Sequence, residues 1–208
     1  MRLSKNAAAL TFVMSSFAIG VQAQSADSPW NFPDFSCTQV IHTPAYDMPM
    51  KLYHSGSNVR VEKSAAISVL YVTSDSKIYN LTTYPDGSHQ CVVMNPKQAK
   101  MLPSPLELLY GTNVKRTPAG TEVVEGHKCK VEDVEVERAN GMKIESKVWE
   151  AEDLKGVPVK IESQLPKSKL TAFYRDIVLG TPDQALFTPP AKCTPYEKMG
   201  QVVEHIGN

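Results

Sequence analysis

Hydrophobic and polar residues alternate along most of the chain in short runs separated by turn residues, which is typical of antiparallel β-strands. The clearest stretch runs from Glu122 to Pro190 and predicts four or five consecutive strands. Turn residues at Ser55–Asn58, Asn140–Gly141 and Lys155–Gly156 separate neighbouring runs. Earlier strands are expected at residues 36–42, 50–54, 59–63, 67–73, 77–82 and 90–94. The pattern therefore predicts one long antiparallel sheet.

Two features predict that something covers this sheet. Residues 170–179 are apolar at both parities, and a strand of that kind is covered on both faces. Asn95–Pro96 and the capping box Ser104–Glu107 predict a short helical insert over residues 95–111, ended by Gly111. We expect this insert to cover the second face of the strand at 170–179.

Smaller irregularities complete the pattern. A change of apolar parity at Glu132–Asp133 predicts a β-bulge. A helical turn is expected to begin at Thr181, and a terminal helix at Thr194. The predicted fold class is mainly β (α+β): a curved antiparallel sheet or half-open β-barrel, with the insert over its concave face and a short C-terminal helix.

The first 23 residues have the pattern of a secretory signal peptide. Arg2 and Lys5 precede an apolar run, and Val21-Gln22-Ala23 fits a cleavage site after Ala23. The apolar run is short for a membrane span, and no second spanning segment is expected. The predicted organisation is a signal peptide at 1–23, an irregular lead-in at 24–35, the half-barrel at 36–193 and a helix at 194–208.

Charge and cysteine content narrow the class of protein. Removal of the signal would leave 20 basic against 22 acidic residues, which argues against nucleic-acid binding. Four cysteines in an exported chain predict two disulfides, with three connectivities open. Because domain termini often lie close together, we expect Cys37–Cys193 together with Cys91–Cys129.

Four phrases occur in an order that resembles a known family. They are Gly126-His127-Lys128-Cys129, the run from Val148 to Leu154, the run from Gly156 to Lys160, and Leu186-Phe187-Thr188-Pro189-Pro190. This order is similar to that of exported domains of unknown function in the superfamily of the outer-membrane lipoprotein carrier, called LolA-like. The resemblance covers about residues 36–192. It implies a curved half-barrel with an apolar concavity, located in the periplasm.

The resemblance further implies a non-enzymatic protein that shields an acyl chain, a lipid or a lipoprotein segment. The expected cavity walls combine the insert and the sheet: Leu106, Leu109, Tyr110, Trp149 and Phe173. The alternative is that these side chains fill the core of an envelope-stress or protein-interaction module with a protein partner. Both interpretations require a periplasmic location and no cofactor.

Catalytic and metal sites have little sequence support. The chain lacks the HExxH, GxSxG, Walker A and GxGxxG motifs, and its five histidines are scattered. One minor alternative is a copper(I) site, because imidazole and thioether ligands suit that ion. Its candidate ligands lie within 13 residues: His42, Met48, Met50 and His54.

Overall fold

The protein forms one open sheet of twelve strands. The computed structural model describes residues 33–42, 46–72, 76–95, 98, 106, 113–137, 143–165 and 168–198. The strands are β1 (Phe35–His42), β2 (Asp47–Ser55), β3 (Asn58–Glu62), β4 (Ile67–Val72), β5 (Lys77–Thr83), β6 (His89–Met94), β7 (Asn113–Val124), β8 (His127–Glu137), β9 (Lys143–Ala151), β10 (Pro158–Leu165), β11 (Ser168–Leu179) and β12 (Thr194–Pro195). Two short 3₁₀ helices follow β11, namely η1 (Gln184–Phe187) and η2 (Tyr196–Lys198).

Strand β1 joins two lobes of the sheet. The strand order is β12-β6-β5-β4-β3-β2-β1-β11-β10-β9-β8-β7, so β1 pairs with β2 on one side and with β11 on the other. Every pairing is antiparallel except the short parallel pairing of β12 with β6. We call β2–β6 the first lobe and β7–β11 the second lobe. The two ends of this order, β12 and β7, do not pair with one another.

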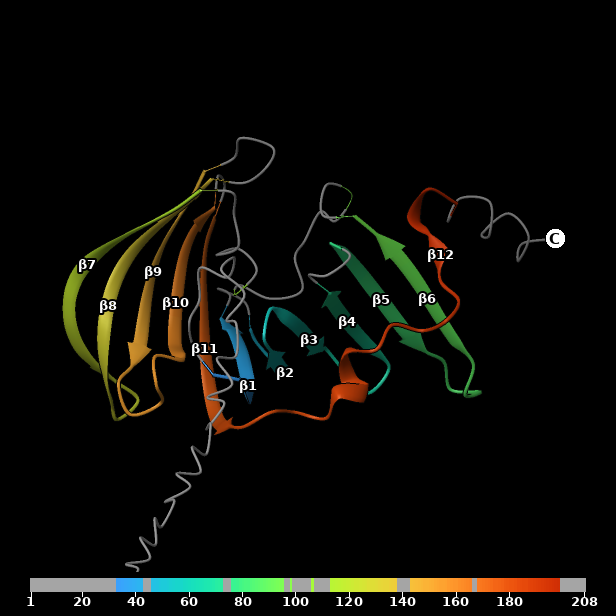
Figure 1. Ribbon diagram of the computed structural model, residues 1–208, viewed down its shortest axis with the longest axis horizontal. Coiled ribbons are helices and arrows are strands. Elements are labelled where there is room, and N and C mark those ends of the chain that lie inside the picture. The colour runs from blue at the N-terminus through green and yellow to red at the C-terminus, as the bar shows by residue number, and fades with distance from the viewer. Residues whose placement is uncertain are drawn as a thin grey trace, which may run out of the picture.

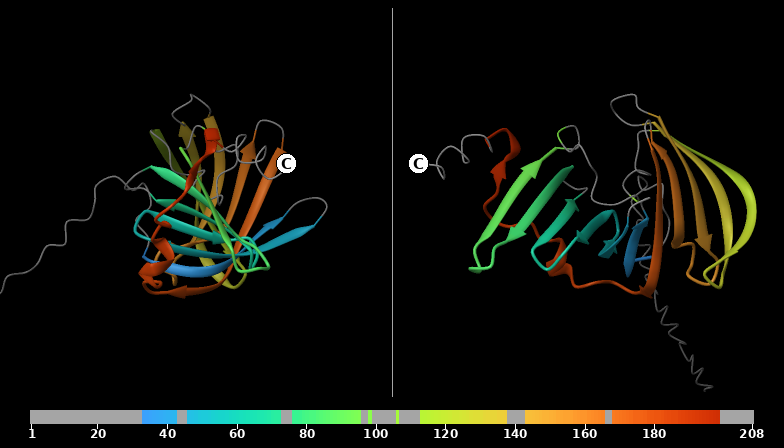
Figure 2. Two further views of the ribbon diagram at one scale, coloured as in Figure 1. Left: turned by 90° about the vertical axis from the view of Figure 1, so that its right-hand side faces the viewer. Right: turned by 180° about the vertical axis from the view of Figure 1, so that it is seen from behind.

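The sheet is strongly curved, as the sequence pattern predicts. Figure 1 shows the second lobe bowing outward at β7, with the first lobe beside it. Figure 2 shows the strands of the first lobe crossing those of the second at a steep angle. Such curvature leaves a concave face and an outer face. The predicted curved, half-open sheet is therefore confirmed.

Two predicted turns are confirmed by backbone conformation. Gly56, in the turn between β2 and β3, has a φ of 60°. Lys155 and Gly156 have φ values of 55° and 86°, which suits the turn between β9 and β10. The turn expected at Asn140–Gly141 lies outside the described residues.

Three sequence predictions about elements need correction. Strand β7 begins at Asn113 rather than near Glu122, because an edge strand tolerates Pro118 and the register shift between Pro118 and Gly120. No bulge occurs at Glu132–Asp133, since the register of β8 with β9 continues unbroken there. Thr194–Pro195 is a strand and not a helix start.

The structure describes only some of the residues for which helices were predicted. Asp183 caps η1 by accepting a hydrogen bond from the amide of Ala185 at 2.9 Å, so the turn expected after Thr181 is present. Of the insert at 95–111, the structure describes Asn95, Gln98 and Leu106 alone. Residues 199–208 lie outside the described part, and no described helix is long and apolar enough to cross a membrane.

Candidate functional site

The concave face of the sheet carries the largest hydrophobic cluster. Its buried members come from β1–β3, from β8–β11, from Val157 just before β10, and from Leu106 of the insert. On each strand they share one parity, as Val134 and Val136 do on β8. The members are Phe35, Cys37, Ile41, Leu52, Val59, Val61, Leu106, Val134, Val136, Val148, Val157, Ile161, Ala172 and Tyr174. The cluster therefore joins both lobes on one side of the sheet.

A rim of partly buried apolar side chains surrounds this cluster. Met48 and Met50 lie on β2, Val114 on the edge strand β7, and Leu170 and Leu179 on β11. Methionine is flexible and polarizable and packs against ligands of irregular shape. Part of the apolar surface of these rim side chains therefore remains accessible to a ligand.

Polar groups inside the concave face bond to one another. The Nε2 of Gln39 donates to the hydroxyl of Tyr174 at 3.1 Å, which links β1 to β11. The hydroxyls of Ser146 and Ser163 lie 2.8 Å apart, between β9 and β10. All four side chains are buried. Two pairs of buried polar side chains therefore bond to one another across strands on this face.

His54 is the buried titratable imidazole of this face. Its ring stacks on Phe35 with 5.3 Å between centroids, and it is 1% exposed. Burial lowers the pKa of His54 to about 4, with Asp34 opposing the shift. His54 is therefore neutral at pH 7 and belongs to the hydrophobic core.

The sequence-predicted cavity walls do not all meet. Leu106 lies in the concave cluster, whereas Trp149 and Phe173 lie on the outer face, next in sequence to concave-face residues. Trp149 packs in a separate cluster with Cys129, Val131, Ala151 and Val159. Leu109 and Tyr110 lie outside the described residues.

Cations cover the aromatic rings on the outer face. The Nζ of Lys160 lies 4.2 Å from the ring centroid of Trp149 and 5.9 Å from that of Phe173. The guanidinium of Arg175 covers Phe173 at 5.4 Å. The second face of β11 is thus covered by cationic side chains, and Leu106 of the insert packs on the first face instead.

The cysteine pairing differs from the prediction. Cys91 bonds to Cys193, while Cys37 and Cys129 are buried free thiols. Cys91 lies on β6 and Cys129 on β8, near opposite ends of the strand order, and Figure 1 shows these two strands on opposite sides of the molecule. Burial raises the pKa of both free thiols. The predicted pairs Cys91–Cys129 and Cys37–Cys193 are therefore wrong.

The candidate copper ligands are divided between two faces. His42 is exposed on the outer side, where its Nδ1 lies 2.7 Å from Asp47. The other three candidates lie on β2 and point to the concave side, opposite to Asp47, the partner of His42. They are Met48, Met50 and His54. Within the described ranges, no three His, Cys, Asp or Glu residues gather to hold a metal ion.

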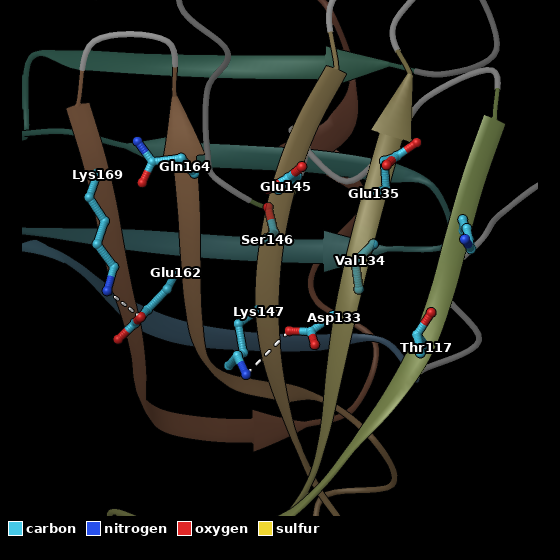
Figure 3. Close-up of a pocket in the computed structure, with 11 residues that line it drawn as sticks. Thr117, Asp133, Val134, Glu135, Glu145, Ser146, Lys147, Glu162, Gln164 and Lys169 are labelled. Atoms are coloured by element: carbon cyan, nitrogen blue, oxygen red, sulfur yellow. Dashed lines mark ion pairs between the residues drawn. The ribbon is translucent and has the colours of Figure 1, made fainter.

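The outer face of the second lobe contains a polar hollow of about 350 Å³ that the sequence did not single out. Figure 3 shows its side chains on five neighbouring strands. Lys147 pairs with Asp133 at 3.3 Å, and Lys169 pairs with Glu162 at 2.5 Å.

Searches for similar proteins give distant structural matches. The chain matches no protein-family model and no curated protein. It is 12% identical to a solved structure of PNGF-II, with a TM-score of 0.44, over 83% of this chain and 33% of that one. The Pseudomonas aeruginosa MucA/MucB complex gives 15% identity and a TM-score of 0.44, over 77% and 57%.

A LolA superfamily protein from Nitrosomonas europaea also matches, at 10% identity and a TM-score of 0.32, over 77% of this chain and 92% of that one. This is the superfamily that the sequence phrases resemble. The chain spans about a third of PNGF-II and over half of the matched chain of the MucA/MucB complex.

Proposed function

We propose that the protein is a non-catalytic binding protein that holds a hydrophobic ligand on the concave face of its sheet. The ligand class is an acyl chain, a lipid or an acylated lipoprotein segment. The observation that carries the proposal is the apolar rim around the concave cluster, with Leu106 of the insert packed into that cluster. Ligand sites are commonly concave and apolar with few polar groups.

The internal chemistry of this face favours an uncharged chain. Gln39 bonds to Tyr174 and Ser146 bonds to Ser163, so each of these four side chains has a partner within the protein. His54 is neutral at pH 7. A charged group placed among these buried residues would lose hydration, which is costly unless an opposite charge pairs with it.

The proposed location is the periplasm. The Cys91–Cys193 disulfide is typical of proteins from an oxidising compartment, and the signal-like pattern of residues 1–23 agrees with export. A ligand with a hydrophobic chain would need shielding from water in that compartment.

A displacement assay with a fluorescent fatty acid tests the ligand site. Leu170→Lys places a charge on the concave rim, and Thr171→Lys places the same charge on the next residue, which faces the outer side. Both wild-type side chains are half-buried, so the pair is matched. We expect Leu170→Lys to weaken probe binding at least tenfold and Thr171→Lys to change it less than twofold.

Thermal melts of both variants check that they are folded. Equal weakening by the two substitutions, or no binding of the probe by the wild type, would contradict the proposal. An absence of lipid together with a stable protein partner in crosslinking would favour the interaction-module alternative.

A further inference from the structure

The segment after β11 lies across the outer face of the first lobe and is fastened by one covalent bond. Residues 180–198 run along β3–β6 and end beside β6, as Figure 1 shows. The Cys91–Cys193 disulfide joins this segment to β6, with the two Cα atoms 4.6 Å apart. We call residues 188–198 the distal strap.

The near half of the segment has its own anchors. Phe187 is buried against Leu70, Val72 and Tyr79. Arg60 donates from a guanidinium nitrogen to the carbonyl of Leu186 at 3.2 Å. Gln184 donates to the hydroxyl of Ser55 at 3.2 Å. Residues 184–187 would therefore stay in place without the disulfide.

Among the described residues, the distal strap has few anchors besides the disulfide. Its residues Thr188 and Pro190–Lys192 are exposed. Strand β12 contributes two parallel pairs, Thr194 with Val92 and Pro195 with Val93. Beyond them, Glu197 accepts a hydrogen bond from Gln98 at an exposed position. Contacts this sparse hold a segment weakly.

Among the described cysteines, the pair in the disulfide is more accessible to reagents than the two free thiols. Cys193 is half-buried, and its sulfur lies at an exposed position 3.7 Å from the carbonyl of Pro190. Cys37 is 4% exposed and Cys129 is 0% exposed, each in a different cluster. An attacking thiolate therefore reaches the disulfide and not the free thiols.

We propose that Cys91–Cys193 is a reducible clamp whose opening releases the distal strap while the sheet remains folded. A dithiol reductant attacks the disulfide and forms a mixed disulfide. Its second thiol then resolves the bond, which yields the cyclic oxidised reductant and the free thiols of Cys91 and Cys193. Release uncovers the edge of β6 at Val92 and Val93, and a bare edge strand can pair with an extended polypeptide. This inference does not depend on the proposed ligand site.

Global unfolding is the competing outcome. The disulfide closes a loop with a sequence separation of 102, so its loss also favours the unfolded chain. The two buried thiols distinguish the outcomes, because they become reactive only if the clusters around them open.

The test treats the full chain with dithiothreitol, alkylates it under native conditions and maps the labelled cysteines. We expect label on Cys91 and Cys193, with Cys37 and Cys129 labelled only after denaturation. Hydrogen exchange of the reduced protein should speed up at least tenfold in residues 188–198 and in β6, and less than twofold in β8–β10. Native labelling of Cys37 or Cys129, or unchanged exchange in the strap, would overturn the proposal.

A pair of variants repeats the test without reductant. Cys193→Ser should give the same local increase in exchange, while Lys192→Ser, an exposed neighbour that keeps the disulfide, should leave exchange unchanged. If both variants behave like the wild type, the disulfide does not hold the strap.

Discussion

The outer faces of the two lobes differ in how much of each is covered by other parts of the chain. In the first lobe, the outer face is apolar and is covered by the segment after β11, with Phe187 buried against Leu70 and Tyr79. In the second lobe, much of the outer face is open to solvent and carries charged pairs such as Lys147 with Asp133. One sheet thus combines burial of both faces in one lobe with a solvated face in the other. The comparison indicates that stability depends on the segment after β11 in the first lobe and little on the ion pairs of the second.

Phe187→Ala tests the covered face of the first lobe and should have the largest effect. Removing a buried phenylalanine side chain costs about 3 kcal/mol of unfolding free energy, from lost burial and a remaining cavity. Chemical denaturation followed by circular dichroism gives the value. A loss below about 1 kcal/mol would mean that the segment contributes little to the first lobe.

The pH dependence of stability tests the contribution of buried His54, which lies on β2 next to the strand that joins the lobes. Its pKa is about 4 in the folded protein and about 6.5 when unfolded, so the unfolded state binds more protons between these values. Stability contributed by neutral His54 is therefore complete above pH 6.5 and decreases as pH falls toward 4, by about 3 kcal/mol in total.

Denaturation at a series of pH values measures this loss, with His54→Leu as the control. The variant keeps an apolar side chain between Phe35 and Val59 and should lose much less stability over the same pH range. Identical pH profiles for the two proteins would show that His54 does not cause the acid sensitivity.

Lys147→Ala tests the polar outer face and should have the smallest effect. Lys147 and Asp133 are both more than two fifths exposed, and exposed pairs contribute about 0.5 kcal/mol or less. The same denaturation assay should show a change within that range. A loss comparable to that of Phe187→Ala would remove the contrast between the lobes.

Local sequence pattern predicted the strands well because alternation and turn residues act over a few positions. The turns at Gly56 and Lys155–Gly156 are examples, since each needs a positive φ that the local residues permit. Strand β7 was partly missed because Pro118 and Gly120 usually interrupt strands, and their tolerance depends on the edge position.

The candidate site was harder to predict because it depends on which face each side chain takes. Trp149 and Leu106 are both apolar and buried, yet they lie in different clusters on opposite faces. The pairing of Cys91 with Cys193 follows from the path of the segment after β11. The order of strands in the sheet decides both features, and local alternation carries no information about that order.

Native mass spectrometry of the gently purified full chain tests the central claim most directly. We predict an added mass corresponding to an acyl lipid, which Leu170→Lys reduces and Thr171→Lys retains. A wild-type protein that carries no lipid, and takes up none from mixed phospholipid vesicles, would contradict hydrophobic ligand binding on the concave face.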